Sequence, residues 1–277
     1  MSLADLPPLR ETLAAQGLLA KKSFGQHFLL DLNITRKIAR IAGPLAGCAV
    51  LEIGPGPGGL TRALIESDAA HIIAVEKDRR FIELLQELAE LAPGRLTVIE
   101  ADALDVDEAA LLAAHAPGLP SRVIANLPYN VGTPLLIKWL TGPYQPDSMT
   151  LMFQREVAER IAAPVKDEAY GRLAVICQLL ADTSVVMNLP PQAFTPPPRV
   201  HSAVVRLDLR ADRPTGKRLA RVEDVTRHAF GQRRKMLRSS LKGMGGEALC
   251  ERAGVDAGLR AEDVPIEGFL RLADAAL

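Results

Sequence analysis

The stretch Val50-Leu-Glu-Ile-Gly-Pro-Gly-Pro-Gly-Gly-Leu-Thr61 decides how the rest of the chain is organised. An apolar run from Ala49 to Ile53 enters a cluster of glycines, and a helical pattern from Leu60 to Ile65 follows at once. A strand, a tight glycine turn and a helix in succession bring a nucleotide-like ligand against bare backbone. Glycine suits this turn because a Cβ would hold the ligand away, and because some positions need a positive φ.

The spacing of the glycines fits two kinds of cofactor. The pattern G-x-G-x-x-G is satisfied by Gly54, Gly56 and Gly59, and Glu76 follows 22 residues after Gly54, at the end of the next apolar run. This is also the dinucleotide-binding fingerprint. Dinucleotide loops hold a pyrophosphate partly through backbone N–H groups, which proline lacks. The two prolines of the loop therefore favour a ligand without phosphate, such as S-adenosylmethionine, over a dinucleotide or a turn with no ligand.

Beyond the glycine turn, strand and helix patterns alternate. Strands are expected at 71–75, 96–100, 122–125 and 148–153, with helices at 79–91, 107–115 and 133–140. The alternation predicts an α/β fold with a Rossmann-like, mostly parallel and doubly wound sheet. Two strands at 184–189 and 201–209 have no helix between them, which predicts an antiparallel edge pair. We expect a catalytic domain over 1–210 and a small all-helical domain over 211–277.

Polar residues follow several strands of this predicted sheet, at the edge where parallel sheets bind ligands. Glu76 is placed to accept both ribose hydroxyls of an adenosine, whereas the alternative is a solvent-facing acid. Asp102 is placed to accept a hydrogen bond from an adenine amino group, although Asp is equally at home as a turn or helix cap. Together with Gly54 and Gly56, these residues form the expected cofactor site.

The tetrad Asn126-Leu-Pro-Tyr129 follows the next strand and carries the most specific signal. The amino nitrogen of adenine is a poor nucleophile, so it needs two acceptors that pull on its hydrogens and aim its lone pair. The Asn126 side-chain carbonyl and the Pro128 backbone carbonyl are the candidates, and Tyr129 offers a face for the base to stack on. Catalysis would then rest on positioning and electrostatics. The plainer alternative is an ordinary turn after a strand.

Two further stretches point to a nucleic-acid substrate. Phe194, in the stiff segment 194–200, would close the second side of a flipped base, although without Tyr129 a core aromatic is the simpler interpretation. From Arg213 to Lys242 there are ten Lys/Arg against two acids, a net of +8. A helical face with Arg234 and Arg238 four residues apart would follow an RNA backbone, where a merely solvated face is the alternative. The expected RNA contacts are Arg233, Arg234, Lys235 and Arg238.

Composition sets broader limits. The chain has 277 residues, 33 Lys+Arg and 33 Asp+Glu, so its overall charge gives no hint of a polyanionic partner. Three cysteines without a C-x-x-C pair indicate reduced thiols in a cytoplasmic protein and no metal site. No signal peptide pattern and no membrane-length apolar stretch is present in the sequence, so no membrane partner is expected.

Taken together, the motifs resemble those of the bacterial KsgA (RsmA) family, the small-subunit (16S) rRNA adenine N6,N6-dimethyltransferases. The resemblance covers nearly the whole chain and rests on the segments at 24–29, 52–59, 126–129, 170–173, 194–199 and 230–235. It implies S-adenosylmethionine as donor and two adjacent adenosines near the 3′ end of the rRNA as acceptors, each methylated twice during late subunit assembly. The expected partner is therefore rRNA within the pre-30S particle, with the enzyme acting as a monomer. The resemblance also implies that Gln26, His27 and Leu29 cover the cofactor.

Two departures from the family and three alternatives remain open. His201 stands where relatives often have Asp, and Arg199 where they often have Lys. The nearest alternative is a large-subunit rRNA adenine methyltransferase of the antibiotic-resistance type, against which the segments at 194–199 and 230–235 count. An NAD(P)-dependent oxidoreductase fits the glycine spacing but not the loop prolines or the Asn126 tetrad. A non-catalytic ribosome assembly factor would keep only the basic segment.

Overall fold

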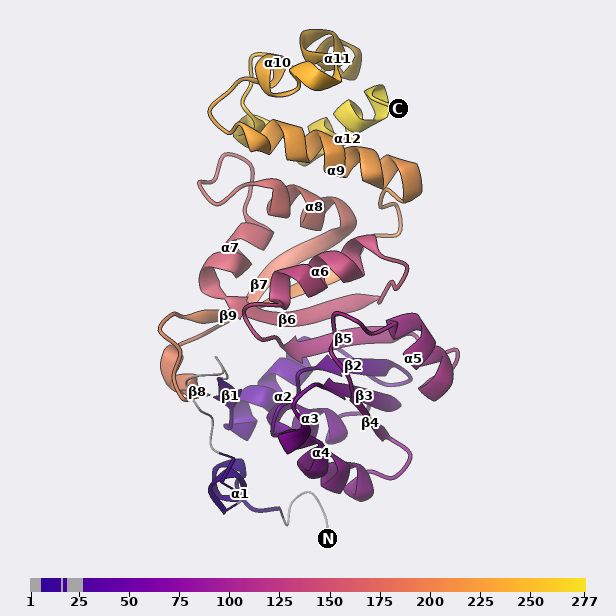
Figure 1. Ribbon diagram of the computed structural model, residues 1–277, viewed down its shortest axis with the longest axis vertical. Helices are drawn as coiled ribbons and strands as arrows, with labels where there is room; N and C mark the ends of the chain where they lie inside the picture. The colour runs from indigo at the N-terminus through magenta and orange to yellow at the C-terminus, as the bar shows by residue number, and fades with distance from the viewer. Residues whose placement is uncertain (1–5, 16, 19–26) are drawn as a thin grey trace. The chain divides into compact units, whose positions relative to one another are not determined.

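The computed structural model describes residues 6–15, 17–18 and 27–277, and it divides into two compact units (Figure 1). The first unit comprises Met1–Ala158 and Val185–Arg206, and the second Glu159–Ser184 and Leu207–Leu277. The expected boundary near residue 210 lies close to one of these divisions, but Glu159–Ser184 groups with the C-terminal helices rather than with the sheet. The assignment of 211–277 as a separate functional domain stays a prediction.

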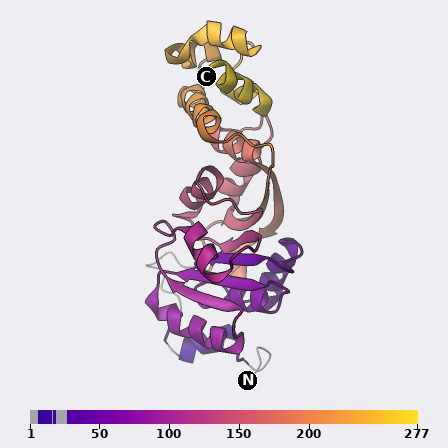
Figure 2. The same cartoon turned by 90° about the vertical axis from the view of Figure 1, so that its right-hand side faces the viewer.

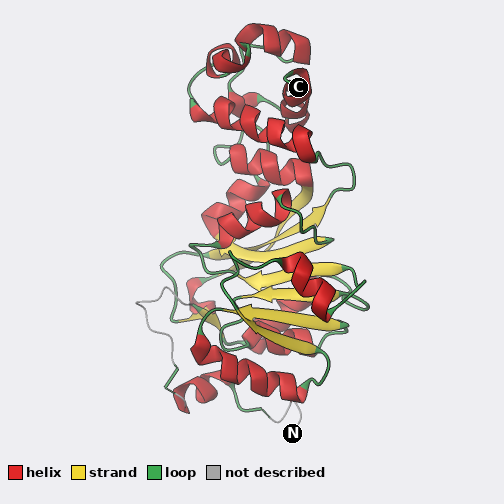
Figure 3. Ribbon diagram, turned by 45° about the vertical axis from the view of Figure 1, so that its right-hand side comes forward, coloured by secondary structure: helices red, strands yellow, loops and turns green. Residues whose placement is uncertain are grey.

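The first unit follows the predicted β/α alternation. Figure 3 shows its strands side by side with helices packed around them. Its elements are α1 (Leu9–Ala15), β1 (Phe28–Leu29), α2 (Leu32–Ile41), β2 (Ala49–Ile53), α3 (Gly59–Ile65), β3 (His71–Glu76), α4 (Arg79–Leu91), β4 (Leu96–Glu100), α5 (Glu108–His115), β5 (Ser121–Asn126), α6 (Gly132–Thr141), β6 (Ser148–Gln154), α7 (Arg155–Ala162), the 3-10 turn η3 (Pro191–Ala193) and β8 (Phe194–Thr195). The helix α7 and the strands β7 (Ala181–Leu189) and β9 (Ser202–Leu209) each run through a division between the units, so each belongs to both in part.

The order of the strands creates the place for a site. The seven-stranded sheet has the order β4-β3-β2-β5-β6-β9-β7, and the pairs β2–β3, β3–β4, β2–β5 and β5–β6 are parallel. The chain builds outward from β2 through β3 to β4, and then returns to the other side of β2 with β5, as the labels in Figure 1 show. Figure 2 shows the same ribbon turned by 90°. Ligands bind at such a reversal of strand order, beyond the carboxyl ends of the strands. The glycine turn after β2 and Asn126 at the end of β5 therefore flank the reversal.

A short second sheet, absent from the sequence predictions, brings two distant segments together. Its strands β1 and β8 are antiparallel, with Phe28 opposite Thr195 and Leu29 opposite Phe194. Phe28, Leu29 and Phe194 are all buried in the hydrophobic core of the first unit. This pairing fixes β1 against the rest of the unit. In that position the backbone of β1 contacts the glycine turn.

The glycine turn adopts the conformations that its sequence predicts. Gly54 and Gly56 have φ values of 64° and 55°, in the left-handed region that favours glycine. A Cβ on Gly59 would lie 2.3 Å from the Leu29 carbonyl oxygen, which is far inside contact distance. The first turn of α3 therefore packs directly on the backbone of β1, and only a residue without a side chain permits that approach.

The second unit is helical apart from its shares of β7 and β9. It contains α8 (Arg172–Leu180), α9 (Gly216–Gly231), α10 (Leu237–Ser240), α11 (Gly246–Ala253) and α12 (Ile266–Ala275), with 3-10 turns η4 (Lys242–Met244) and η5 (Ala261–Asp263). The rings of Phe230 and Phe269 stack with centroids 5.4 Å apart, and Tyr170 meets Phe230 edge to face at 6.1 Å. The Tyr170 hydroxyl donates to the Val264 carbonyl at 3.0 Å, so this buried ring has its polar end satisfied.

The close approach at Gly59 generates a stability prediction. We expect Gly59→Ala to destabilise the protein by about 1–3 kcal/mol, because the added methyl must push Leu29 and its strand away. Gly231→Ala is the matched control, since nothing lies within 4 Å of a Cβ there and Ala favours the helix of α9. Thermal unfolding of both variants measures the effect. A Gly59→Ala protein as stable as the control would show that β1 does not depend on this contact.

Candidate functional site

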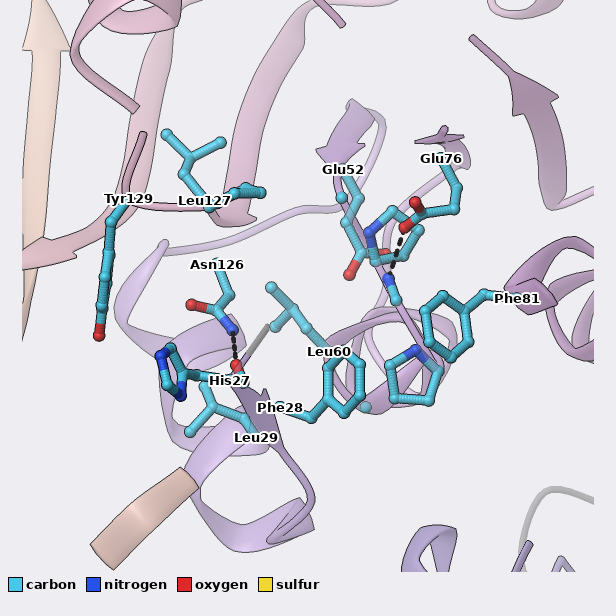
Figure 4. A pocket seen from close by; sticks show the side chains of 16 residues that line it. His27, Phe28, Leu29, Glu52, Leu60, Glu76, Phe81, Asn126, Leu127 and Tyr129 are labelled. Carbon is cyan, nitrogen blue, oxygen red and sulfur yellow. Dashed lines mark hydrogen bonds between the residues drawn. The ribbon is translucent and has the colours of Figure 1, made fainter. Parts of the chain in front are cut away.

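A pocket opens at the reversal of strand order, beyond β2, β3 and β5 (Figure 4). All of its lining comes from the first unit, namely from the segment around β1, the glycine turn, α3, the end of β3, α4 and the Asn126 tetrad. The lining residues are His27, Phe28, Leu29, Glu52, Gly54, Pro55, Gly56, Pro57, Gly59, Leu60, Glu76, Phe81, Asn126, Leu127, Pro128 and Tyr129. We call this the strand-end pocket. It brings the glycines, Glu76, Asn126 and Tyr129 together, as the sequence predicts.

Glu76 is fixed by the backbone around it. Its carboxylate accepts from the Gly56 N–H at 2.9 Å, from Lys77 N–H at 2.9 Å and from Asp78 N–H at 2.8 Å. The side chain is buried, and this burial raises the pKa of Glu76, although the three donors favour the ionised form. A carboxylate offers about four lone-pair positions, so one acceptor position remains for a ligand. The contact with Gly56 also ties the glycine turn to the end of β3.

Asn126 is oriented through its amide nitrogen. Its Nδ2 donates to the His27 carbonyl at 3.4 Å, while Oδ1 accepts no hydrogen bond from the described residues and lies on the pocket side (Figure 4). Tyr129 is held by its hydroxyl, which shares a 2.6 Å hydrogen bond with the buried Ser202. Burial raises the pKa of Tyr129, so the phenol is neutral near pH 7. Its ring lies 5.9 Å from that of His27, tilted by 30°.

The carbonyl of Pro128 does not suit the acceptor role that the sequence predicts. It accepts from the Val131 N–H and from the Gly132 N–H, both at 3.1 Å, so both of its lone pairs are used in the turn before α6. The Leu127 carbonyl accepts none of the turn or loop hydrogen bonds found among the described residues, and Leu127 also lines the pocket. The geometry therefore moves the second acceptor back by one residue, from Pro128 to Leu127.

The residues expected to cover the cofactor lie at the pocket only in part. Leu29 lines it, and so does His27, whose Nδ1 lies 2.8 Å from the Pro196 carbonyl. Gln26 lies outside the described residues. Asp102 does not line the pocket: it pairs with Lys77 at 2.6 Å and accepts from the Leu104 N–H at 3.1 Å. In this structure Asp102 thus caps a turn, the alternative left open by the sequence.

Phe194 also lies elsewhere. It is 3% exposed, belongs to the core and does not line the pocket. Its backbone pairs with Leu29 in the β1–β8 sheet, which turns the ring into the interior. The predicted stacking role is therefore wrong for this conformation, because Phe194 would have to leave the core to reach a base. The core alternative is the better description.

The basic segment has a different local structure from the predicted helical face. The helix α9 ends at Gly231, residues 232–235 form turns, and Met236 is extended and bridges to Arg260. Arg234 and Arg238 therefore do not share a helix, since the extended backbone at Met236 interrupts the helical rise between them. The prediction of an i, i+4 pair is wrong, although both side chains are exposed.

Within this segment Arg233 differs from its neighbours. Its guanidinium donates to the carbonyls of Glu168 at 2.7 Å and Tyr170 at 3.0 Å, and pairs with Glu262 at 3.3 Å. These contacts are all inside the second unit and hold the turn after α9. Arg234, Lys235 and Arg238 are exposed and form no ion pair with the described residues. They are thus the better candidates for contact with a polyanion.

A buried acid of the pocket, Glu52, was not among the cofactor contacts expected from the sequence, although its charge before the glycine turn already favoured a ligand without phosphate. Glu52, the fourth residue of β2, is 1% exposed, lines the pocket, and has no hydrogen-bond partner for either carboxyl oxygen among the described residues. Burial, with a smaller contribution from the charge of Glu76, raises the pKa of Glu52 to about 8. Its position in a buried parallel strand, two residues before Gly54, could have identified it from the sequence. Burying an unpaired acid costs folding free energy, so an acid at such a position indicates a functional role.

Two negative findings apply to the described residues. They contain no group of three or more His, Cys, Asp or Glu side chains placed to hold a metal ion. Over the same residues, every helix is too short or too polar to cross a membrane.

Solved structures with the same fold are methyltransferases. A dimethyladenosine transferase from Plasmodium falciparum aligns with a TM-score of 0.73 and 25% identity, over 89% of this chain and 96% of that one. The 23S rRNA methyltransferase ErmE aligns with a TM-score of 0.69 and 28% identity, over 90% of this chain and 98% of that one. The parallel sheet, the strand-end pocket and these likenesses define a Rossmann-like methyltransferase with a helical C-terminal part.

Sequence comparisons narrow the class to one family. The family model for ribosomal RNA adenine dimethylase matches residues 17–276, and the chain belongs to this family. It is similar to the ribosomal RNA small subunit methyltransferase A of Phenylobacterium zucineum, with 64% identity over 100% of this chain and 95% of the relative. It is also similar to the protein of that name from Caulobacter vibrioides, with 62% identity over 94% and 98%. Membership of this family counts against the alternative of an NAD(P)-dependent oxidoreductase.

The raised pKa of Glu52 predicts how stability depends on pH. The folded-state pKa of about 8 lies above the ordinary value of 4.5, so folding favours the protonated carboxyl. Wild-type stability should therefore fall as pH rises from about 5 to about 8. Glu52→Gln cannot ionise, so its melting temperature relative to wild type should rise over the same range.

Glu100→Gln is the matched control, because Glu100 ends β4 of the same sheet but is exposed and paired with Arg79. Its melting temperature relative to wild type should show no such rise. A constant difference between Glu52→Gln and wild type at all pH values would mean that Glu52 is ionised in the folded protein throughout.

Proposed function

We propose that the protein transfers methyl groups from S-adenosylmethionine to N6 of two adjacent adenosines near the 3′ end of small-subunit (16S) rRNA. Each adenosine would receive two methyl groups, late in the assembly of the subunit. The observation that carries the proposal is the free Oδ1 of Asn126, which lies in one pocket with the glycine turn and Glu76. Membership of the ribosomal RNA adenine dimethylase family supports the same reaction.

The lining of the pocket fits this methyl donor. It contains two carboxyl groups, Glu52 and Glu76, and no Lys or Arg among the described lining residues. Such a lining suits a ligand with a sulfonium and an ammonium, and it opposes a pyrophosphate. Glu76 would accept from one ribose hydroxyl with its remaining lone pair, and Gly54 and Gly56 would let the ligand approach the backbone. When bound, S-adenosylmethionine supplies an electrophilic methyl group.

The rest of the pocket would hold the acceptor base. Asn126 Oδ1 and the Leu127 carbonyl would each accept one hydrogen of the adenine amino group, which aims the nitrogen lone pair at the methyl carbon. Tyr129, anchored by Ser202, would stack against the base. Neither acceptor is a basic carboxylate, so the amine would lose its proton after attack. Asn126 and Leu127 would act by positioning and by stabilising the positive charge that develops on the nitrogen.

The choice of substrate rests on the relatives. The most similar relatives reported above are named as small-subunit methyltransferases at 62–64% identity, whereas the ErmE likeness is at 28%. These identities favour the small subunit over the large-subunit alternative. We propose rRNA in the pre-30S particle as the partner and the cytoplasm as the place of action, with the protein working as a monomer. Gln26, His27, Leu29 and Asp102 remain proposed cofactor contacts, of which Asp102 would have to exchange its Lys77 partner for adenine.

A methyl-transfer assay tests the proposal and the role of Asn126 together. Unmethylated small subunits and large-subunit RNA are incubated separately with labelled S-adenosylmethionine, and the RNA is digested to nucleosides. We expect N6,N6-dimethyladenosine only from the small-subunit sample. Asn126→Ala should reduce transfer by at least about a hundredfold, because it removes one of two positioning acceptors, and should leave cofactor affinity nearly unchanged.

Glu76→Ala is the matched comparison, because it should weaken cofactor binding itself. Equal losses of cofactor affinity in the two variants would contradict the role given to Asn126. The absence of dimethyladenosine from the small-subunit sample would refute the proposed reaction.

The basic segment generates a prediction about RNA binding. Replacing Arg234, Lys235 and Arg238 with Ala should weaken binding and lower the salt slope by about two to three, since each released phosphate contact contributes roughly 0.7–0.9. Arg218→Ala is the matched control, because Arg218 is also exposed but pairs with Asp274 at 2.7 Å. Filter binding over a range of salt concentrations gives the slopes. A slope unchanged by the triple replacement would remove this segment from the interface.

A further inference from the structure

Glu52 is a buried acid of the strand-end pocket to which the proposed reaction assigns no contact beyond its charge. Its carboxyl points toward the interior of the pocket from β2 (Figure 4), and both oxygens lack a hydrogen-bond partner among the described residues. An ionised carboxylate that is 1% exposed and unpaired is strongly disfavoured. A neutral carboxyl is tolerated more easily, and a cation brought beside it would reverse the preference.

The groups around Glu52 do not supply that cation. Glu76, at the end of the neighbouring strand β3, has the same charge sign, and α4 contributes only Phe81 to the lining. From α3, the buried Thr61 hydroxyl favours the charged form of Glu52, but its effect is smaller than that of burial. Arg62 of the same helix donates to the Pro7 carbonyl at 3.0 Å and does not line the pocket.

The remaining titratable groups of the lining are Tyr129, which follows β5, and His27, which precedes β1. The Tyr129 hydroxyl bonds to Ser202 and the His27 ring to the Pro196 carbonyl, so neither forms its hydrogen bond with Glu52. No Lys or Arg lines the pocket in the described residues. The two carboxyl groups also differ from one another, because Glu76 accepts three backbone N–H bonds and Glu52 accepts none. Glu52 is therefore the group whose charge state a ligand would change.

We propose that Glu52 is a proton-linked receptor for the positive charge of the methyl donor, neutral in the empty pocket and ionised when S-adenosylmethionine binds. In this step the O–H bond of the Glu52 carboxyl breaks and the proton passes to the solvent, while the cofactor itself is unchanged. The inference rests on the proposed function and extends it, because it makes cofactor affinity depend on pH through one residue.

The direction of the linkage follows from burial, which raises the pKa of Glu52 to about 8. Near pH 7 most empty pockets would hold a neutral Glu52, so binding should release about one proton per cofactor. Affinity should then increase with pH between about pH 6 and pH 7.5, by at most roughly tenfold per unit. The proton is released on binding and taken up again when the cofactor leaves.

Isothermal titration calorimetry of the full chain with S-adenosylmethionine tests this inference. Titrations near pH 7 in phosphate and in Tris, whose ionisation enthalpies differ, give the number of protons released. We expect about one for wild type and about none for Glu52→Gln, which also binds roughly tenfold more weakly at pH 7.5. Glu52→Asp keeps a carboxyl group and should still release a proton when S-adenosylmethionine binds. This variant decides the test if Glu52→Gln binds S-adenosylmethionine too weakly to measure.

His27→Gln is the matched control, because it removes another titratable lining group and should leave the proton number per bound cofactor unchanged. Wild-type binding without proton release would overturn the inference and leave the proposed reaction intact. Equal release by wild type and Glu52→Gln would also overturn it, since another group would then be the source. Failure of the wild type to bind S-adenosylmethionine would instead overturn the cofactor assignment.

Discussion

The parallel pairing of β2 between β3 and β5 is the constraint on which the site depends. Ala49 to Leu51 pair with both neighbours, so the ends of three strands are fixed side by side. Because parallel neighbours end at the same edge, the glycine turn, Glu76 and Asn126 must meet there whatever the loops do. The hydrogen bond from Gly56 to Glu76 then locks the turn to its neighbour. The loops contribute what the sheet does not, namely the cover from the β1 segment and the Ser202 anchor for Tyr129.

The alternation of strands and helices could be predicted from the sequence because each parallel strand is a short, mostly apolar run bounded by turn residues. The helix α4 has the predicted bounds, since its apolar residues recur along one buried face. Elements without such a pattern were missed. The strands β1 and β8 have two residues each, too few for any periodicity, and exist only because they pair with each other. The helix α9 begins at Gly216, but its first turns show no apolar pattern in the sequence, because they are charged and bury only Leu219.

The candidate site divides in the same way between what a local pattern can predict and what it cannot. The glycines, Glu76, Asn126 and Tyr129 follow strand ends directly, so their convergence could be inferred from topology. The positions of Phe194 and Asp102 depend on what each side chain meets in the folded chain: the core for one and Lys77 for the other. The Pro128 carbonyl is used by the turn that starts α6, which only the backbone path reveals. Arg233 belongs to the fold of the second unit for the same reason, since its partners at 168, 170 and 262 are far away in sequence.

Glu52 illustrates why a binding pocket is costly to its own fold. A neutral residue at this position would spare β2 an unpaired buried carboxyl, yet the pocket keeps two acids and no Lys or Arg among its described lining. Such an arrangement lowers the free energy of unfolding of the empty protein, and it favours a bound cation. Binding a cationic ligand therefore offsets part of the stability that the folded protein lacks without it. The same reasoning explains how one glycine turn can be assigned to a cofactor when its spacing alone fits two. Backbone N–H groups and glycines accommodate many nucleotides, but the charge of the lining distinguishes a cationic methyl donor from an anionic dinucleotide.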